Sequence, residues 1–168
     1  MFTRLIRVSL CFAIGVFLLL EQPMATDRDA LISLYNATGG DSWSDKSGWK
    51  DAPTLADGFN SDPCAEPVWF GVTCQGNSVT RLYLIINQLT GSIPSEVGSL
   101  SNLQFLGLNY NQLTGPIPSE LGNLTNLHDG NGLLLHNNHL YTDSNTLREF
   151  LNSKGTGSGS WEDSQTTK

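Results

Sequence analysis

Charged residues are scarce in this chain, and their balance is acidic. They make up 15% of the sequence, and 16 acidic against 9 basic side chains give a formal net charge of −7. Nucleic acids, anionic membrane surfaces and polyanionic substrates are bound through clusters of Lys and Arg, and the sequence has no such cluster. These classes of partner are not expected, although an acidic balance also serves simply to keep an exported protein soluble.

Sequence motifs of catalysis are missing as well. The chain has no Gly-rich phosphate loop, no G-x-S-x-G turn and no H-E-x-x-H motif. Asp129-Gly-Asn-Gly lacks the further carboxylates of a calcium loop. We therefore expect a protein that is not an enzyme and that needs no cofactor.

The one long apolar run is too short to cross a bilayer. Residues 8–20 make a run of about 13 residues, whereas a spanning helix needs about 20. Arg4 and Arg7 precede the run and small residues follow it, which is typical of a secretory signal peptide. Residues 1–25 are therefore predicted to be a signal cleaved after Ala25, which makes the protein secreted or extracytoplasmic. An uncleaved anchor at the cell surface is the alternative.

Two copies of one pattern occupy residues 79–100 and 103–124. The equivalent residues are 24 positions apart: Asn87 and Asn111, Gly91 and Gly115, Pro94 and Pro118. The pattern L-x-x-L-x-L-x-x-N-x-L at a period in this range indicates a leucine-rich-repeat solenoid. Alternating leucines such as Leu106 and Leu108 predict a strand with one buried face. The Asn that follows is suited to hydrogen-bond backbone groups where the chain turns.

One coil cannot bury its own leucines. Each copy contributes about seven apolar side chains to a shared core, at about 1.5–3 kcal/mol for each one fully buried. Such burial needs a neighbouring coil or a cap at each open end. The residues on both sides of the repeats are therefore expected to form caps.

The segments Asn-x-Leu-Thr-Gly-x-Ile-Pro that end at Pro94 and Pro118 resemble the plant-specific subtype of leucine-rich repeats. This subtype is familiar from polygalacturonase-inhibiting proteins and receptor-kinase ectodomains, and it also occurs in secreted microbial proteins. The resemblance covers about residues 27–124. It implies an α/β fold, a right-handed solenoid of about three coils with a parallel sheet on the concave side. A helical and aromatic N-terminal cap and a helical C-terminal cap would close it.

Residues 26–78 are expected to form the N-terminal cap. An amphipathic helix is predicted to begin with a capping box of Thr26 and Asp29 and to end at Gly39-Gly40. Aromatic residues that follow are expected to cover the open end of the first coil: Trp43, Trp49, Trp69 and Phe70. A carbohydrate-stacking platform is the alternative role for them.

Cys64 and Cys74 are the only cysteines that remain when residues 1–25 are removed. The stretches around them, Asp62-Pro-Cys and Trp69-Phe-Gly-Val-Thr-Cys, resemble the N-terminal cap of the same family, in which the two cysteines are joined. The implied disulfide would stabilise the fold by about 2.5–3 kcal/mol, and export permits the oxidation. A zinc site is the rival interpretation, but no matching Cys or His pair lies nearby.

The third copy is irregular. Asn138 lies 27 residues after Asn111 rather than 24, which puts Leu133 and Leu135 in the strand. The surplus is expected to be absorbed in residues 128–132, whose glycines permit a bulge or a tight turn. The repeats are thus predicted to span residues 79–140.

Residues 141–161 are predicted to form the C-terminal cap, followed by a polar tail at 162–168. Asp143-Ser144 resemble helix N-cap residues, and Leu147, Phe150 and Leu151 fall on one helical face.

Three histidines crowd the third copy: His128, His136 and His139. The spacing His136-x-x-His139 invites a metal interpretation, but the repeat register puts His136 on the exposed strand face and His139 in the turn after Asn138. Solvated or capping histidines are the plainer interpretation, so no metal site is predicted.

Alternate strand residues point away from the core, and stacking aligns them in columns on the concave face. These columns combine aromatic, aliphatic and a few polar side chains, a mixture that marks contact sites. The predicted ligand-binding residues are Arg81, Tyr83, Ile85, Ile86, Phe105, Asn109, Tyr110, Leu134 and His136. Arg81 and Asn109 are expected to be polar anchors. The alternative is that the side chains of this small sheet pack on each other.

The function expected from the sequence is recognition without catalysis. The chain would act as a secreted, monomeric module that binds a protein or peptide ligand on its concave face. Inhibition of a secreted cell-wall hydrolase, as in some members of the resembled family, is a second hypothesis. A structural, ice-adsorbing or carbohydrate-binding surface ranks below both, because only Thr90 and Thr114 repeat in register.

Overall fold

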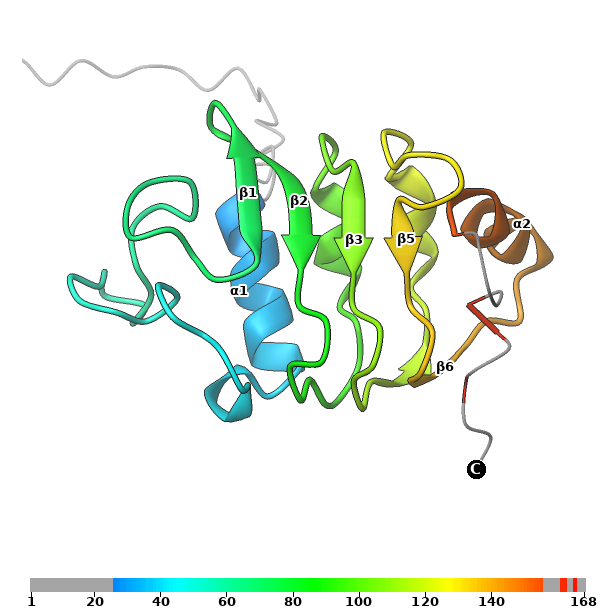
Figure 1. Cartoon of the computed structure of the whole chain (residues 1–168), viewed down its shortest axis with the longest axis horizontal. Helices are drawn as coiled ribbons and strands as arrows, with labels where there is room; N and C mark the ends of the chain where they lie inside the picture. Colours follow the sequence, from blue (N-terminus) through cyan, green and yellow to red (C-terminus); the bar gives the residue numbers. More distant parts are fainter. Residues whose placement is uncertain (1–25, 156–160, 163–164, 166–168) are drawn as a thin grey trace, which may run out of the picture.

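The chain winds from an N-terminal helix through a row of strands to a C-terminal helix (Figure 1). The computed structural model describes residues 26–155, 161, 162 and 165, so the signal predicted for residues 1–25 lies outside the described residues. Its helices are α1 (Asp27–Ala37), η1 (Gly40–Ser42), η2 (Ser95–Ser99), η3 (Ser119–Asn123) and α2 (Asn145–Lys154). Its strands are β1 (Val72–Gln75), β2 (Ser78–Tyr83), β3 (Phe105–Gly107), β4 (Thr114–Pro116), β5 (Leu133–Leu134) and β6 (His139–Tyr141).

The main sheet has the order β1-β2-β3-β5. Strands β2, β3 and β5 are parallel, and Leu82, Leu106 and Leu133 lie opposite one another in register. These three residues are equivalent positions of the three copies, so the predicted parallel solenoid is confirmed. Strand β1 pairs antiparallel with β2, an element that the sequence did not predict within residues 26–78.

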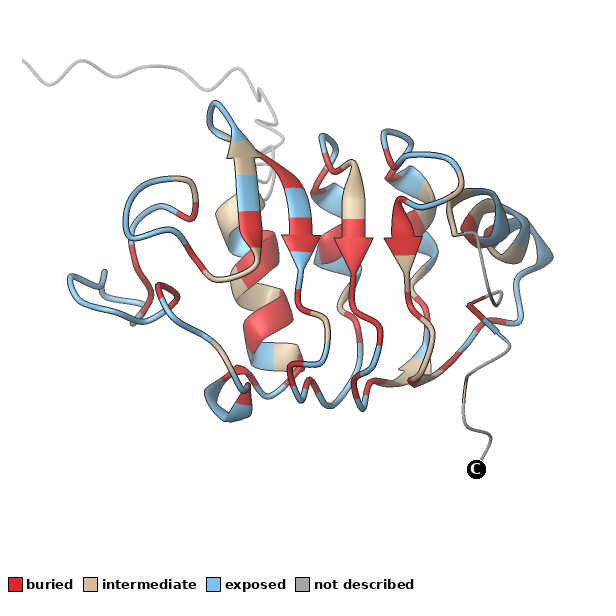
Figure 2. Cartoon of the chain, in the orientation of Figure 1, coloured by how far each residue is buried: buried red, intermediate tan, exposed pale blue. Residues whose placement is uncertain are grey.

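The repeat leucines form the core. Leu82, Leu84, Leu106 and Leu108 are at most 1% exposed. Figure 2 shows buried residues in β2, β3 and β5 and on the side of α1 that faces the sheet. Behind the strands, α1 lies beside η2, η2 beside η3, and η3 beside α2. Each coil is thus covered by its neighbour, as the pattern requires.

The repeat asparagines join successive coils through their side chains. Asn111 Oδ1 accepts hydrogen bonds from the backbone N–H groups of Asn87 and Leu89 at 2.9 and 3.0 Å. Its Nδ2 donates to the backbone oxygens of Leu84 and Leu108 at 2.8 and 2.9 Å. All these groups lie where the chain leaves the strand, so the role predicted for the repeat Asn is confirmed.

Extra residues of the third copy loop out before β5. The backbone ladder runs at the 24-residue period as far as His128, whose N–H donates to Gln104 O at 3.1 Å. Gly132 N–H then donates back to His128 O at 2.9 Å, and Gly132 O accepts from Leu106 N–H at 2.7 Å. Residues 129–131 are therefore the insertion, and Gly130 within it has a φ of 86°. This confirms the predicted position of the surplus.

The N-terminal helix begins as predicted. Thr26 caps α1, and its side chain and that of Asp29 form the reciprocal capping box. Gly39 takes the left-handed conformation after the helix, with a φ of 69°.

The tryptophans of this region are core residues. Trp43, Trp49 and Trp69 are at most 3% exposed and share one cluster with the repeat leucines. The ring centroids of Trp43 and Trp49 are 5.0 Å apart, and those of Trp49 and Trp69 are 4.7 Å apart. The alternative that these three rings form a carbohydrate-stacking platform is therefore wrong, because none of their faces is open to a sugar.

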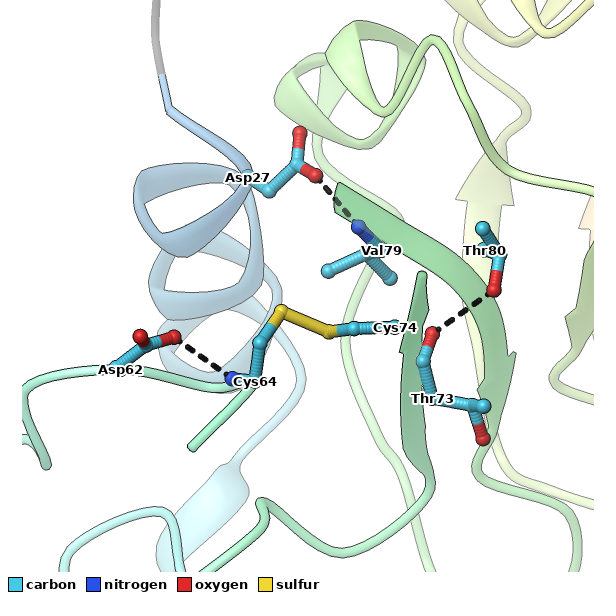
Figure 3. The surroundings of a disulfide bond; sticks show 7 residues. All are labelled: Asp27, Asp62, Cys64, Thr73, Cys74, Val79 and Thr80. Atoms are coloured by element: carbon cyan, nitrogen blue, oxygen red, sulfur yellow. Dashed lines mark hydrogen bonds between the residues drawn. A yellow bond between two sulfur atoms is a disulfide. The ribbon is translucent and has the colours of Figure 1, made fainter. Parts of the chain in front are cut away.

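Cys64 and Cys74 form a disulfide, as the resemblance implied (Figure 3). The bond ties the loop before β1 to the strand itself. The Asp62 carboxylate accepts from the Cys64 N–H at 2.8 Å, and the Asp27 carboxylate accepts from Val79 N–H at 2.7 Å (Figure 3). Strand β1 is thereby fixed to the loop that precedes it, and β2 is fixed to the start of α1.

A second sheet was not predicted from the sequence. Strand β4 pairs with β6 in parallel, and Thr114 lies opposite His139. The prediction that His139 lies in a turn is therefore wrong, because the chain extends directly after Asn138 to pair with the preceding coil. Ser144 caps α2 as expected, and its side chain accepts from Leu147 N–H at 3.2 Å.

Candidate ligand-binding face

Phe105 lies at the centre of the predicted face, held between two other side chains. The guanidinium carbon of Arg81 on β2 is 4.6 Å from the centroid of the Phe105 ring. The His128 ring, which precedes the third-coil insertion, is 4.5 Å from the same centroid. The Tyr83 ring is stacked at a longer distance of 6.2 Å. Phe105 is half-buried, so part of this residue remains open to solvent.

Arg81 has free hydrogen-bonding capacity. The four ion pairs of the described residues use Arg28, Lys50, Arg148 and Lys154, and Lys46 donates to a backbone oxygen. Among the described residues, Arg81 is the one cationic side chain that makes neither a hydrogen bond nor an ion pair, although the chain as a whole carries a net charge of −7. A guanidinium presents a planar fork of N–H donors that fits a carboxylate. Stacking on Phe105 holds that fork in place.

Gly107 leaves room for neighbouring side chains to lie across the middle of the sheet. A Cβ atom at this position would be 2.9 Å from Tyr83 Cδ1 and 3.1 Å from Ile85 Cδ1. Tyr83 is 37% exposed, and Ile85 and Leu134 are half-buried. Tyr83 and Ile85 therefore lie close together above Gly107, which agrees for these two residues with the alternative interpretation.

Asn109 is not an accessible anchor. It is 5% exposed, and its Nδ2 lies 3.1 Å from His136 Nε2 of the next coil. Its Oδ1 is buried without a partner among the described residues. The prediction is wrong because the chain turns away at Tyr110, which leaves the Asn109 carboxamide against the neighbouring coil. His136 itself is half-buried, with its ring 5.2 Å from that of Tyr110.

Ile86, Tyr110 and Asn137 do not continue the strands. All three occupy one repeat position and adopt the left-handed conformation, with φ values of 54°, 56° and 56°. The strands end before them, so the prediction of a strand column at this position is wrong. Ile86 is 70% and Tyr110 53% exposed, and both side chains stand at the rim of the face.

His128 is a member of the face that sequence reasoning missed. Its signal was present, because Thr80, Gln104 and His128 are successively 24 residues apart. Aligning the third copy on Asn138 hid this relationship, because the inserted residues 129–131 lie between His128 and Asn138.

The described part of the chain shows neither a metal cluster nor a spanning helix. No group of three or more His, Cys, Asp or Glu side chains within it is arranged to hold a metal ion. No helix in the described ranges is long and apolar enough to cross a membrane.

The stacked parallel strands, the repeat asparagines that join the coils and the repeat sequence are those of a leucine-rich-repeat solenoid, and the repeats resemble the plant-specific subtype. The Leucine Rich Repeat family model matches residues 102–124. A nodulation receptor kinase of Pisum sativum is 39% identical over 56 residues, which cover 31% of this chain and 6% of that protein.

Several solved structures share the fold. The PEPR1-AtPEP1 crystal structure aligns with a TM-score of 0.53 and 29% identity, over 75% of this chain and 16% of that one. A plant ice-binding protein aligns with a TM-score of 0.56 and 26% identity, over 76% of this chain and 37% of that one. The ectodomain of the receptor kinase SOBIR1 from Arabidopsis thaliana, at 22% identity and a TM-score of 0.53, matches 76% of this chain and 62% of that one. The chain thus spans less than two thirds of each of these relatives.

Proposed function

We propose that this chain is a secreted, monomeric, non-catalytic recognition module that binds a protein or peptide on its concave face. The observation that carries the proposal is the pairing of Arg81 with Phe105. Arg81 is an exposed cation that makes neither a hydrogen bond nor an ion pair within the described residues, and it lies beside an apolar surface in a protein of acidic charge. Arginine and aromatic residues are enriched where binding energy concentrates.

The chemistry of this pair suits a ligand with a carboxylate next to an apolar side chain. The carboxylate would accept from the Arg81 guanidinium, and the apolar group would contact Phe105, Tyr83 and the rim at Ile86. Three strands offer a small face, so we expect modest affinity or a short epitope. The similarity to PEPR1, which was solved with AtPEP1, supports a protein or peptide partner. The Cys64–Cys74 disulfide supports export, because such bonds persist in oxidising compartments.

A capture experiment with matched variants tests the proposal. The immobilised chain, its Phe105→Glu variant and its Tyr141→Glu variant are exposed to the secretome of the source, and bound peptides are quantified by mass spectrometry. Tyr141 is a suitable control because it is 52% exposed on β6, in the other sheet. We expect a ligand that the wild type and Tyr141→Glu retain and that Phe105→Glu loses, with all three chains folded by circular dichroism. Equal capture by Phe105→Glu would show that the assigned face is wrong.

A second candidate function, ice adsorption, is favoured by the similarity to the plant ice-binding protein. Thr90 and Thr114 occupy equivalent repeat positions. In the third coil His139 lies opposite Thr114. The row of aligned threonines is therefore only two residues long. Ice recrystallisation assays discriminate the two candidates. Inhibition that Thr90→Ala abolishes and Phe105→Glu leaves intact would favour ice adsorption, and a wild type without inhibition would dismiss it.

A further inference from the structure

A polar hollow lies at the end of the main sheet where β2 and β3 begin (top of Figure 1). Its volume of about 270 Å³ is close to the lower end of the range of small-molecule sites, about 300–1,000 Å³. The hollow, called here the flank hollow, is lined by residues from the end of β1, the start of β2 and the turns before β3 and β5: Gln75, Ser78, Thr80, Asn102, Gln104 and Asn126. None of these residues belongs to the candidate ligand-binding face.

Equivalent repeat positions build the flank hollow as two rows across the coils. Ser78, Asn102 and Asn126 are successively 24 residues apart, and Thr80 and Gln104 are separated by the same interval. Gln104 N–H donates to Thr80 O at 2.8 Å, so the first two coils lie here at the spacing of paired strands, about 4.8 Å. The rows therefore present polar side chains of successive coils at a regular separation.

Most polar groups of the flank hollow are free to contact a ligand. Four of its side chains make no hydrogen bond within the described residues: Gln75, Ser78, Asn102 and Gln104. The other two are each fixed by one bond. The Thr80 hydroxyl donates to Thr73 O at 3.2 Å, and Asn126 Nδ2 donates to Ser101 O at 2.7 Å. Both keep an acceptor oxygen, so the hollow combines two oriented acceptors with four adaptable side chains.

The chemistry of this lining suits a neutral ligand that carries hydroxyl groups. No charged side chain of the described residues lines the hollow, so an ionic ligand would lose hydration there without gaining an opposite charge. The lining also has no aromatic residue among those described, and aromatic and Arg side chains are the usual anchors of protein partners. A sugar hydroxyl both donates and accepts hydrogen bonds, and carboxamides and hydroxyls supply both kinds of partner.

We propose that the flank hollow binds a neutral oligosaccharide whose chain runs across the coils. The strand spacing of about 4.8 Å is close to the length that each sugar adds to an extended β-1,4-linked chain, so successive sugars would meet equivalent side chains of successive coils. Asn102, in the middle of its row, and Gln104 contact the central sugar. This site is separate from the candidate ligand-binding face, so the activity is additional to the proposed binding of a protein or peptide and does not depend on it.

Nuclear magnetic resonance titration of the purified chain with cellohexaose, an extended neutral β-1,4-linked oligosaccharide, tests the proposal. We expect the side-chain amide signals of Asn102, Gln104 and Asn126 to shift. The signal of Gln112, an exposed glutamine outside the hollow, should stay in place. The same three amides should shift less with maltohexaose, which has the same sugar in a curved chain. They should not shift with an oligogalacturonide, which carries carboxylates.

Single substitutions measure the contribution of the second coil. Asn102→Ala and Gln104→Ala should each weaken the binding of cellohexaose by about 2–10-fold, which corresponds to the loss of one hydrogen bond. Gln112→Ala is the matched control and should leave the affinity unchanged. Asn102 and Gln112 are exposed and Gln104 is half-buried, so all three variants are expected to fold, which circular dichroism checks.

Several results would overturn the proposal. The first is a set of hollow amides that do not shift at millimolar cellohexaose, and the second is an affinity that neither Asn102→Ala nor Gln104→Ala lowers. Equal shifts with maltohexaose would refute the match to the strand spacing, and equal shifts with the oligogalacturonide would refute the preference for a neutral chain. Shifts caused by a ligand captured on the concave face, with none caused by cellohexaose, would show that the hollow extends the protein-binding face instead.

Discussion

The backbone N–H of Asn87 donates to the side-chain oxygen of Asn111 in the next coil, over 2.9 Å. The two residues occupy the same repeat position, and both are buried. The turn of each coil is thus held by the asparagine of the coil that follows. Asn87 does the same for the N-terminal region, because its side chain accepts from Asp45 N–H at 2.7 Å and donates to Asp45 O at 2.8 Å.

Asn111→Ala is expected to lower the free energy of unfolding by about 2–6 kcal/mol. The substitution leaves the N–H groups of Asn87 and Leu89 without their acceptor, and each buried polar group left unpaired costs about 1–3 kcal/mol. Urea unfolding measures the change. Asn102→Ala is the control, because Asn102 is exposed. A loss no larger than that of the control would show that the ladder does not stabilise the coils.

Gly98 and Gly122 share a repeat position but differ in their surroundings. A Cβ atom on Gly98 would lie 2.3 Å from Glu120 O of the next coil, whereas the nearest atom at Gly122 is Leu147 Cδ1 at 4.0 Å. Gly98→Ala should therefore lower the free energy of unfolding by about 1–3 kcal/mol, and Gly122→Ala should change it by no more than about 0.5 kcal/mol. Equal effects in thermal unfolding would mean that the coils are not stacked at this spacing.

Ile86→Asn is expected to stabilise the protein by about 1 kcal/mol. A β-branched residue is strained in the left-handed conformation, whereas Asn tolerates it. Ile86 is 70% exposed, so little burial is lost, and the third coil already has Asn137 at this position with a φ of 56°. Ile85→Asn, at a half-buried neighbour, should destabilise instead. Denaturant midpoints that fall for both variants would contradict the assignment of strain to Ile86.

Much of the fold could be predicted because the repeat pattern determines its own register. Leu106 and Leu108 had to face inward once the 24-residue period was recognised, and their burial follows. Strands β1 and β4 escaped prediction for a physical reason. They are four and three residues long and, unlike the equally short β3 and β5, they carry no alternating leucines. Each is extended because a neighbouring strand pairs with it.

The candidate face was predicted less completely. The position of Arg81 beside Phe105 follows from the register of β2 and β3. The left-handed conformation of Ile86 could not be foreseen, because a β-branched residue is an outlier there. The burial of Asn109 depends on the position of His136, which follows the insertion. No local sequence pattern indicates that position.

The stability of α1 should depend on pH through Asp29. Hydrogen bonds from the Thr26 backbone N–H and then from its hydroxyl hold the pKa of the Asp29 carboxyl below its usual 3.8. A depressed pKa stabilises the fold above the unfolded-state value, and the contribution disappears as the pH falls through the folded-state value. The melting temperature of Asp29→Asn should therefore be lower than that of the wild type at about pH 7, and the gap should close below pH 3.8. A gap that stays constant in acid would contradict this account.

Photo-crosslinking reports which of the two sheets contacts the ligand. A photoreactive phenylalanine derivative is placed at Tyr83 on β2 in one chain and at Tyr141 on β6 in another. Both tyrosines are exposed, at 37% and 52%, so both probes can reach a bound molecule. We expect the captured protein or peptide to be crosslinked from Tyr83 and not from Tyr141. Crosslinking from Tyr141 alone would contradict it.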